Sequence, residues 1–478
     1  MLTSPALTAL AILGVLAIIY VVAGSAVQVL MIPTAVRFLW RHQHRHTRRA
    51  RALATESESG PRVSIVMPAY NESLTIVQSV RALLALDYEF AEIVVVNDGS
   101  TDETLPLLQR TFQLLPAPLA FEQPLATQPV RGVYRSVIES GLVVIDKENG
   151  RCKADAANAG INVASGTLVL VIDADTILDP EALSRAVLPF LEDPTTVAGG
   201  ANVAIANGCR IQDGRITDVF LPRSWLARFQ IVEYMRSFLL ARLTWASFNG
   251  VVIISGAFGL FRRETVIEVG GYDPTAIGED MDLTIRLQRH CRAHGQPFRI
   301  TFDPNALAWT QAPEDWLSLK SQRCRWRRGL LQVLWRYRRM LGNPRYGTVG
   351  LGVLPYLMIF EGLSPLLELA GYIIITLAAV AGALDWPYWR ILVSASVLFG
   401  MTATLLSVLM SDVVTRRYLR GWDLVLLVIV ALLENCGYRQ LNSWWSCVGT
   451  VQAMTGKRGW GVMKRRAFEG APPADVNP

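Results

Sequence analysis

Short apolar runs and amphipathic stretches alternate along the middle of the chain, from residue 62 to about residue 302. The runs VSIVMPAY, EIVVVNDGS, LVVIDK and TLVLVIDAD are rich in Val, Ile and Leu and predict buried strands. Stretches with helical spacing lie between or after them, including ESLTIVQSVRALLAL, TDETLPLLQRTF and KADAANAGINVA. Strands separated by helices predict an α/β domain around a parallel sheet, with a ligand crevice at the carboxyl ends of the strands.

Longer apolar segments flank this region. No charged residue lies between Pro5 and Pro33, a stretch longer than the roughly 20 apolar residues that cross a bilayer. A cleaved signal peptide is the alternative, but the segment lacks a basic start and its apolar run is too long. Further apolar runs near 349–363, 365–384, 391–412 and 421–437 predict C-terminal membrane helices, of which the first is short and fits an interfacial or re-entrant segment better.

The net charge of +6 comes partly from the cluster RFLWRHQHRHTRRAR at 37–51. Lys and Arg collect on the cytoplasmic side of membranes, so we expect the N-terminus outside and the following domain in the cytosol of a multi-pass protein of the cell membrane. The basic runs at 416–420 and 457–466 both favour the cytoplasm although one convincing span separates them, and we place the tail inside. Anionic lipid headgroups are the expected partner of these charges, and nucleic acid is not, because no recognition motif accompanies them.

The six cysteines form no C-x-x-C pair, and a cytosolic domain does not favour disulfides. His290 and His294 are spaced to present two metal ligands on a helix, but the sequence offers no third ligand. We therefore expect an ordinary solvated helix face at these histidines.

Polar residues gather where three predicted strands end: Asn71 and Glu72, Asn97 and Asp98, and Asp173 and Asp175. A single D-x-D also fits a polar strand end or an Asx turn. Alternate residues of an extended chain point to opposite sides, so we expect one of the two aspartates to face a metal directly. Three strands that end in polar residues at the same edge of the sheet predict a ligand-binding site there.

The motifs PAYNE, VNDGSTDET, KADAANAG, DAD, SGAFGLFRR, GED and QRCRW occur in this order. The series resembles the membrane-bound processive glycosyltransferases of family 2, which include the bacterial poly-N-acetylglucosamine, chitin-oligosaccharide, hyaluronan and cellulose synthases. The resemblance covers residues 62–329 and extends loosely beyond them. It implies an α/β, GT-A (Rossmann-like) domain between N- and C-terminal transmembrane helices.

The resemblance also implies a division of the chain into six parts. We expect an N-terminal transmembrane helix (1–36), a basic juxtamembrane linker (37–61), a cytosolic GT-A domain (62–310) and an interfacial amphipathic helix with Q-x-x-R-W (311–348), which is densest in arginine over 323–345. Transmembrane helices (349–437) and an interfacial segment with a basic cytosolic tail (438–478) complete the prediction.

A donor site for a UDP-sugar follows from the resemblance. The residues it implies for nucleotide-sugar binding are Ala69, Tyr70, Glu72, Asp98, Lys153, Asp173, Gln322 and Arg325. Asp98 accepts a hydrogen bond from the uracil N–H, Lys153 meets phosphate at a helix start, and Asp175, with Asp173 nearby, holds Mg²⁺ or Mn²⁺. A helix N-cap at Asp98 and a solvated Lys153 remain the alternatives.

The resemblance makes Asp280 the general base, with Glu279 beside it, and Ser255, Gly256 and Trp326 the acceptor-binding residues. Acidic residues at a helix start are also explained by the helix dipole, and Trp326 by anchoring at a membrane surface. Glycine in a tight turn explains Gly256 as well. Gly278 stands where threonine is common in the family, a departure that affects the detail around the base.

Three acidic residues lie within or at the ends of apolar runs: Glu361, Glu368 and Glu434. Ionisable groups in membrane segments are costly, so we expect them to face a passage for polysaccharide, with side chains that reach the headgroups as the alternative. No regulatory domain fits after residue 457, so control would need a small regulatory or export partner subunit.

The predicted function is inverting, processive transfer of N-acetylglucosamine or glucose from a UDP-sugar to a β-linked polysaccharide, coupled to its export. A transferase that adds one sugar to a membrane glycolipid acceptor would need the D-x-D and Asp280 but not Gln322 and Trp326. A membrane transporter that only binds nucleotide would need no base at Asp280. The motifs do not fix which sugar is used.

Overall fold

The computed structural model describes residues 26–43, 60–117, 121–212, 214–380, 386–415 and 421–457, with Gly382 and a few separate positions before residue 26. Most of the predicted basic linker, the basic run at 416–420 and the tail after residue 457 therefore lie outside the described residues.

The chain folds into two compact units. An α/β unit contains residues 41–227 and 248–314, and a helical unit contains residues 1–40, 228–247 and 315–462. The catalytic domain expected over 62–310 thus contains an insertion, 228–247, that packs with the helical unit instead.

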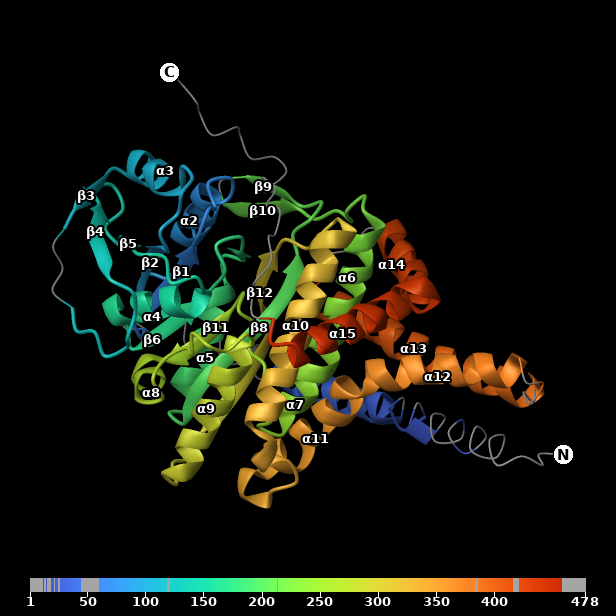
Figure 1. Ribbon diagram of the computed structural model, residues 1–478. Helices are drawn as coiled ribbons and strands as arrows, with labels where there is room; N and C mark the ends of the chain where they lie inside the picture. The colour runs from blue at the N-terminus through green and yellow to red at the C-terminus, as the bar shows by residue number, and fades with distance from the viewer. Residues whose placement is uncertain are drawn as a thin grey trace. The chain divides into compact units, whose positions relative to one another are not determined.

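A ten-stranded mixed sheet forms the core of the α/β unit (Figure 1). Its strands are β1 (Val63–Ala69), β2 (Ala91–Asn97), β3 (Leu114–Pro116), β4 (Val130–Ser136), β5 (Leu142–Lys147), β6 (Leu168–Val171), β7 (Ile177–Leu178), β8 (Thr196–Ile205), β11 (Gly259–Arg262) and β12 (Arg299–Thr310). They lie in the order β3-β4-β5-β2-β1-β6-β11-β8-β12-β7. A separate hairpin joins β9 (Arg210–Gln212) to β10 (Arg215–Asp218).

The four strands predicted from the apolar runs are confirmed, and β5, β2, β1 and β6 are parallel neighbours. The sheet as a whole is mixed, because β11 pairs antiparallel with both β6 and β8, and the pairs β3–β4, β4–β5 and β7–β12 are antiparallel too. A parallel neighbour needs a crossover connection. The alternation of strands and helices that predicted such crossovers ends after β8, and β11 follows a long excursion that contains the β9–β10 hairpin and the helices α6 (Trp225–Arg236) and α7 (Leu243–Ser247).

The helices of the α/β unit connect these strands. They are α2 (Ile76–Leu84), α3 (Thr104–Thr111), α4 (Lys153–Val163), α5 (Ala182–Glu192), α8 (Arg263–Glu268) and α9 (Glu279–Ala293). Helix α4 packs closely on the parallel strands, since a Cβ added to Gly160 would lie 2.3 Å from Val66 Cγ1. This contact fixes the start of α4, and with it Lys153, near the carboxyl ends of the strands.

The helical unit is built from long helices with π-helical and 3₁₀ segments between them. Its helices are α7 (Leu243–Ser247), α10 (Trp316–Arg336), α11 (Leu354–Tyr356), α12 (Ser364–Val380), α13 (Trp386–Thr415), α14 (Gly421–Leu433) and α15 (Arg439–Met454), together with the greater part of α6 (Trp225–Arg236). The π-helical segments are Ser237–Arg242, Val349–Val353, Leu357–Gly362 and Glu434–Tyr438, and the 3₁₀ turns are Arg338–Met340 and Pro344–Tyr346.

Within the segment 311–348, where an amphipathic helix is predicted, helix α10 covers Trp316–Arg336 and so is displaced from the arginine-dense part at 323–345. Helix α10 begins seven residues earlier, where the Asp315 side chain accepts a hydrogen bond from Ser318 N at 2.9 Å. It ends at Arg336, and Gly342 with φ of 69° and Pro344 do not allow a helix to continue.

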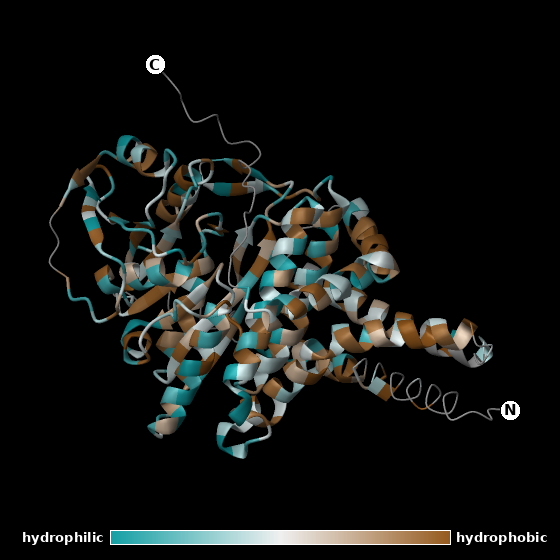
Figure 2. Ribbon diagram, viewed as in Figure 1, coloured by the Kyte–Doolittle hydropathy of each residue, from teal (hydrophilic) through white to brown (hydrophobic). Residues whose placement is uncertain are grey.

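Among the residues that the structure describes, three helical stretches are long and apolar enough to cross a membrane: Val22–Gln43, Val349–Val380 and Gly421–Met454, with mean hydropathies of 1.5, 1.9 and 1.5. Figure 2 shows α12, within the second of them, as predominantly hydrophobic. The apolar run that looked too short to span is therefore the first part of a 32-residue stretch. A shorter apolar helix covers Val397–Ser411.

Candidate active site

The loops after β1 and β2 are hydrogen-bonded to each other. Asp98 N donates to Ala69 O at 2.9 Å, and Thr101 N donates to Asn71 Oδ1 at 2.8 Å. Ala69 and Glu72 are buried, whereas Tyr70 is 49 % exposed. The structure thus brings together the residues expected to line the base and ribose, with an aromatic ring open to a ligand.

Asp98 does not cap the helix that follows it. The N-cap position of α3 belongs to Glu103, and Asp98 Oδ1 instead accepts hydrogen bonds from Lys147 Nζ at 2.6 Å and Gly150 N at 2.9 Å. The alternative reading of Asp98 as a helix N-cap is therefore wrong. Lys147 was not among the residues that the motifs indicated.

Lys153, the first residue of α4, lies among carboxylates. Its Nζ donates to Asp173 Oδ1 and, at 2.8 Å, to Gly256 O. Burial lowers the pKa of Lys153, but Asp173, Glu279 and, less strongly, Asp280 raise it by more, so its pKa lies above the ordinary value. The alternative reading of Lys153 as a solvated lysine is wrong, because its side chain is only 15 % exposed and is paired with Asp173.

The motifs KADAAN, DAD and GED therefore converge. Asn158 Oδ1 accepts from Tyr272 N at 2.8 Å, which ties α4 to the segment that precedes α9. Burial, followed by Glu279 and Asp280, raises the pKa of Tyr272 well above its ordinary value. One strongly negative cluster thus forms from residues that lie more than 100 positions apart in the sequence.

The two aspartates of the D-x-D differ in exposure. The Asp173 side chain is 38 % exposed and pairs with Lys153, whereas Asp175 is only 6 % exposed. Thr176 N donates to Asp173 O at 3.0 Å, so the chain turns directly after β6. The two carboxylates on either side of Ala174 thus differ in burial.

Glu279 and Asp280 are the first two residues of α9, where the helix dipole favours negative charge. Asp280 Oδ1 accepts from Met281 N at 2.8 Å, and Glu279 is buried. The N-cap residue Gly278 has no side chain that could cap the helix, and the Asp280 carboxylate accepts from one N–H of the first turn instead.

Ser255 and Gly256 lie in the turn before β11, where Phe258 N donates to Ser255 O at 2.9 Å. A Cβ on Gly256 would lie 3.0 Å from Lys153 Nζ and 3.8 Å from Asp173 Oδ2. Glycine here allows the backbone carbonyl to approach the lysine, so Gly256 is part of the same cluster.

The Q-x-x-R-W residues lie on α10 in the helical unit. Gln322 is buried, and its Oε1 has no hydrogen-bond partner within the part of the chain that the structure describes. Trp326 is 40 % exposed, and Arg325 is half-buried. Helix α10 thus carries one buried amide oxygen without a hydrogen-bond partner among the described residues and one aromatic ring that is partly exposed.

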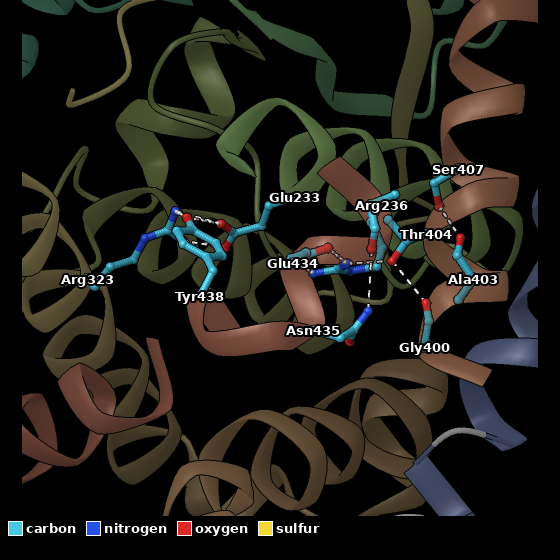
Figure 3. Close-up of polar contacts among 11 residues, drawn as sticks. Glu233, Arg236, Arg323, Gly400, Ala403, Thr404, Ser407, Glu434, Asn435 and Tyr438 are labelled. Carbon is cyan, nitrogen blue, oxygen red and sulfur yellow. Dashed lines mark hydrogen bonds and ion pairs between the residues drawn. The ribbon is translucent and has the colours of Figure 1, made fainter. Parts of the chain in front are cut away.

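Arg323, within the same motif, was missed by sequence reasoning. Its guanidinium pairs with both carboxylate oxygens of Glu233 (Figure 3). Arg323 Nη2 lies 2.7 Å from Glu233 Oε2, and Arg323 Cζ lies 4.7 Å from the centroid of the Trp326 ring. The Tyr438 hydroxyl donates to Glu233 Oε2 at 3.1 Å. Burial lowers the pKa of Arg323, but Glu233 raises it above the ordinary value.

Of the three glutamates within or at the ends of the apolar runs, Glu368 and Glu434 are each paired with an arginine. Glu434 accepts from Arg236 Nη1 and Nη2 at 2.7 and 2.8 Å, as Figure 3 shows, and Glu368 accepts from Arg439 at 3.1 Å. The carboxylate of Glu434 is thus held by a specific ion pair on the inside of the unit, with a side-chain exposure of 4 %.

The α/β unit, a mixed sheet with acidic residues at the carboxyl ends of its strands, has a GT-A-like fold. The fold is similar to that of a mannosyltransferase from Pyrobaculum calidifontis solved with GDP-Man and Mn²⁺, with a TM-score of 0.54, 17 % identity and coverage of 90 % of this chain and 100 % of the other.

Residues 168–435, more than half of the 478, match the family described as glycosyl transferase family group 2, and residues 64–270 match glycosyl transferase family 2. The chain therefore belongs to the family 2 glycosyltransferases.

The chain is also similar to curated synthases. It is 30 % identical over 274 residues to the poly-beta-1,6-N-acetyl-D-glucosamine synthase of Staphylococcus aureus (strain COL), covering 57 % of this chain and 56 % of that protein. It is 26 % identical over 369 residues to the synthase of the same name from Staphylococcus epidermidis, covering 76 % of each. The chain thus matches little more than half the length of the S. aureus relatives.

Proposed function

We propose that the protein is an inverting, processive glycosyltransferase that extends a β-linked polysaccharide from a UDP-sugar and assists its export. The observation that carries the proposal is the convergence of Lys153, Asp173, Glu279 and Asp280 from three separate motifs. Similarity to two poly-N-acetylglucosamine synthases supports N-acetylglucosamine as the first sugar to test, with glucose second.

In the proposed reaction an acceptor hydroxyl oxygen attacks the anomeric carbon from the face opposite the UDP. The bond from that carbon to the phosphate oxygen breaks, and its electron pair leaves with UDP. Asp280 takes the hydroxyl proton, a contribution worth typically 10²–10⁴ in rate for a general base. Lys153 offsets the negative charge that develops on the diphosphate.

The carboxylates of the D-x-D would hold Mg²⁺ or Mn²⁺, which neutralises the diphosphate both for binding and for departure. Within the described ranges no group of three or more His, Cys, Asp or Glu residues could hold a metal ion. A cation bound by one or two carboxylates, with phosphate oxygens as its other ligands, fits this set. The Mn²⁺ in the Pyrobaculum mannosyltransferase supports a divalent ion.

Membrane placement completes the proposal. The three candidate spans among the described residues, and the basic cluster at 37–51 that begins within the last part of the first span, favour a multi-pass protein of the cell membrane with a cytosolic α/β unit. Trp326 would stack on the acceptor sugar, and Gln322 and Arg325 would assist at the donor. A small regulatory or export subunit remains part of the proposal.

The test is to incubate the purified, detergent-solubilised protein with a panel of radiolabelled UDP-sugars and to size the products. A polymer made by the wild type and lost in Asp280→Asn supports the proposal. A single-sugar glycolipid would favour the lipid transferase, and UDP binding without any transfer would favour the transporter.

A further inference from the structure

Lys147, the last residue of β5, is completely buried, with no exposed side-chain surface. A buried ammonium group is costly unless charges and hydrogen bonds compensate for it. Few lysines are fully buried in proteins without such partners. The partners of Lys147 should therefore indicate what its charge does.

Two carboxylates and one carbonyl surround the ammonium group. Its Nζ lies 2.6 Å from Asp98 Oδ1 and 2.5 Å from Asp155 Oδ2, and it donates to Glu148 O at 2.5 Å. Two of the three N–H donors of the ammonium make hydrogen bonds, to Asp98 and Glu148, and the contact with Asp155 adds a second ion pair. Asp98 follows β2 and Asp155 lies in the first turn of α4, so one side chain joins two motifs of the nucleotide-sugar site.

The contacts fix how the Asp98 carboxylate is oriented. Its Oδ1 receives both Lys147 Nζ and, at 2.9 Å, Gly150 N, whereas its Oδ2 has no hydrogen-bond partner among the residues described. Two donors on one oxygen hold the plane of the carboxylate. The second oxygen is thereby left to accept from a ligand.

Two glycines let the loop after β5 close around this lysine. A Cβ on Gly150 would lie 2.3 Å from Asp155 Oδ2, and one on Gly99, whose φ is 65°, would lie 2.9 Å from Asn149 N. Any larger residue at either position would push the loop away from the two aspartates. The backbone of these two loops therefore approaches Lys147, Asp98 and Asp155 closely only because positions 99 and 150 are glycines.

We infer that Lys147 is a positioning residue for nucleotide recognition: it holds Asp98 so that the carboxylate accepts the N3–H of uracil. The inference rests on the proposed function. Uracil carries a hydrogen on N3, whereas N3 of cytosine is an acceptor. A fixed acceptor at Asp98 therefore favours uracil and rejects cytosine, and Lys147 contributes to base selectivity without touching the base.

The test uses Lys147→Met, which keeps an unbranched side chain of similar length but removes the charge. Dissociation constants for UDP and CDP are measured by calorimetry on the full chain in detergent, with donor KM and kcat beside them. A lost hydrogen bond to a charged group predicts UDP binding about ten-fold weaker or more, with little change for CDP. We expect KM to rise more than kcat falls. Lys457→Met, an exposed lysine, is the matched control.

A double-variant cycle separates positioning from general damage. If Lys147 acts through Asp98, the double variant Lys147→Met with Asp98→Asn should bind UDP no more weakly than Asp98→Asn alone. Lys147→Gln, which keeps a donor in the pocket, should retain more of the UDP preference than Lys147→Met. It also supplies the comparison with the wild type if Lys147→Met does not fold.

Each other outcome counts against the inference. Equal weakening of UDP and CDP, additive losses in the double variant, or wild-type selectivity in Lys147→Met and Lys147→Gln would overturn it while leaving the proposed function intact. A wild-type protein that does not bind UDP would overturn the proposed function and the inference together.

Discussion

The buried pair of Glu233 and Arg323 offers the sharpest test of the helical unit. The change is Glu233→Gln, which keeps the shape of the side chain but removes its charge and one acceptor oxygen. In the wild type the Arg323 guanidinium donates to both carboxylate oxygens of Glu233. The Arg323 side chain is only 9 % exposed and the Glu233 side chain 23 %. The substitution therefore leaves a largely buried guanidinium without its counter-charge.

The size of the effect follows from this burial. Removing one partner of a buried ion pair costs about 3–5 kcal/mol. Gln keeps one acceptor, and the Tyr438 hydroxyl remains 3.5 Å from Arg323 Nη2, so the lower value of about 3 kcal/mol is expected. At roughly 2–4 °C per kcal/mol for a unit of this size, the thermal midpoint should fall by roughly 6–12 °C.

The assay is thermal unfolding in one detergent at one scan rate, because membrane proteins commonly unfold irreversibly. Glu103→Gln is the matched control, since Glu103 pairs with Arg110 at 3.0 Å but both side chains are 69 % exposed. An exposed pair contributes less than about 1 kcal/mol, so this variant should unfold within roughly 4 °C of the wild type. Equal shifts for the two variants would refute the reasoning from burial.

Four further predictions concern the chemistry and pH. Asp175→Ala and an excess of chelator should each abolish transfer, and full turnover in chelator would contradict the metal assignment. Asp280→Asn should keep UDP affinity within a few-fold while the rate falls by roughly 10² or more, and near-normal turnover would exclude it as the base. Trp326→Ala should shorten the polymer or raise the share of UDP released without polymer formation, because the lost stacking on the acceptor sugar is worth about 1 kcal/mol. An unchanged product length would argue for the lipid transferase. Burial raises the pKa of Tyr88 from 10.0 to about 12, so the stability that it contributes is complete below pH 10 and is lost as the pH rises to about 12. Denaturant midpoints across this range should fall less steeply in Tyr88→Phe than in the wild type.

Much of the fold could be read from the chain because it depends on local patterns. The strand that ends before Asp98, the helix that begins at Lys153 and the helix that begins at Glu279 each follow from hydrophobic period and from residues suited to strand or helix ends. Since parallel strands end at one edge of a sheet, the gathering of polar residues there was predictable too. The order of the seven motifs then indicated the family.

Periodicity could not indicate partners that lie far apart in sequence. Lys147 looks like the polar end of a strand, yet the loop after it folds over and buries it between Asp98 and Asp155. Nothing in the spacing of β11 shows that it runs antiparallel to its neighbours, because that depends on the path of the preceding excursion.

The helical unit shows the same division between local pattern and tertiary structure. Apolar composition alone predicted where its long apolar helices lie, because a helix surrounded by lipid or protein needs apolar side chains along its whole length. The pairing of Glu233 with Arg323, 90 positions away, and of Arg236 with Glu434, 198 positions away, was decided by how the helices pack. A charge buried in such a unit is stabilised only by the particular opposite charge that packing brings to it, so the partner is a property of the tertiary structure.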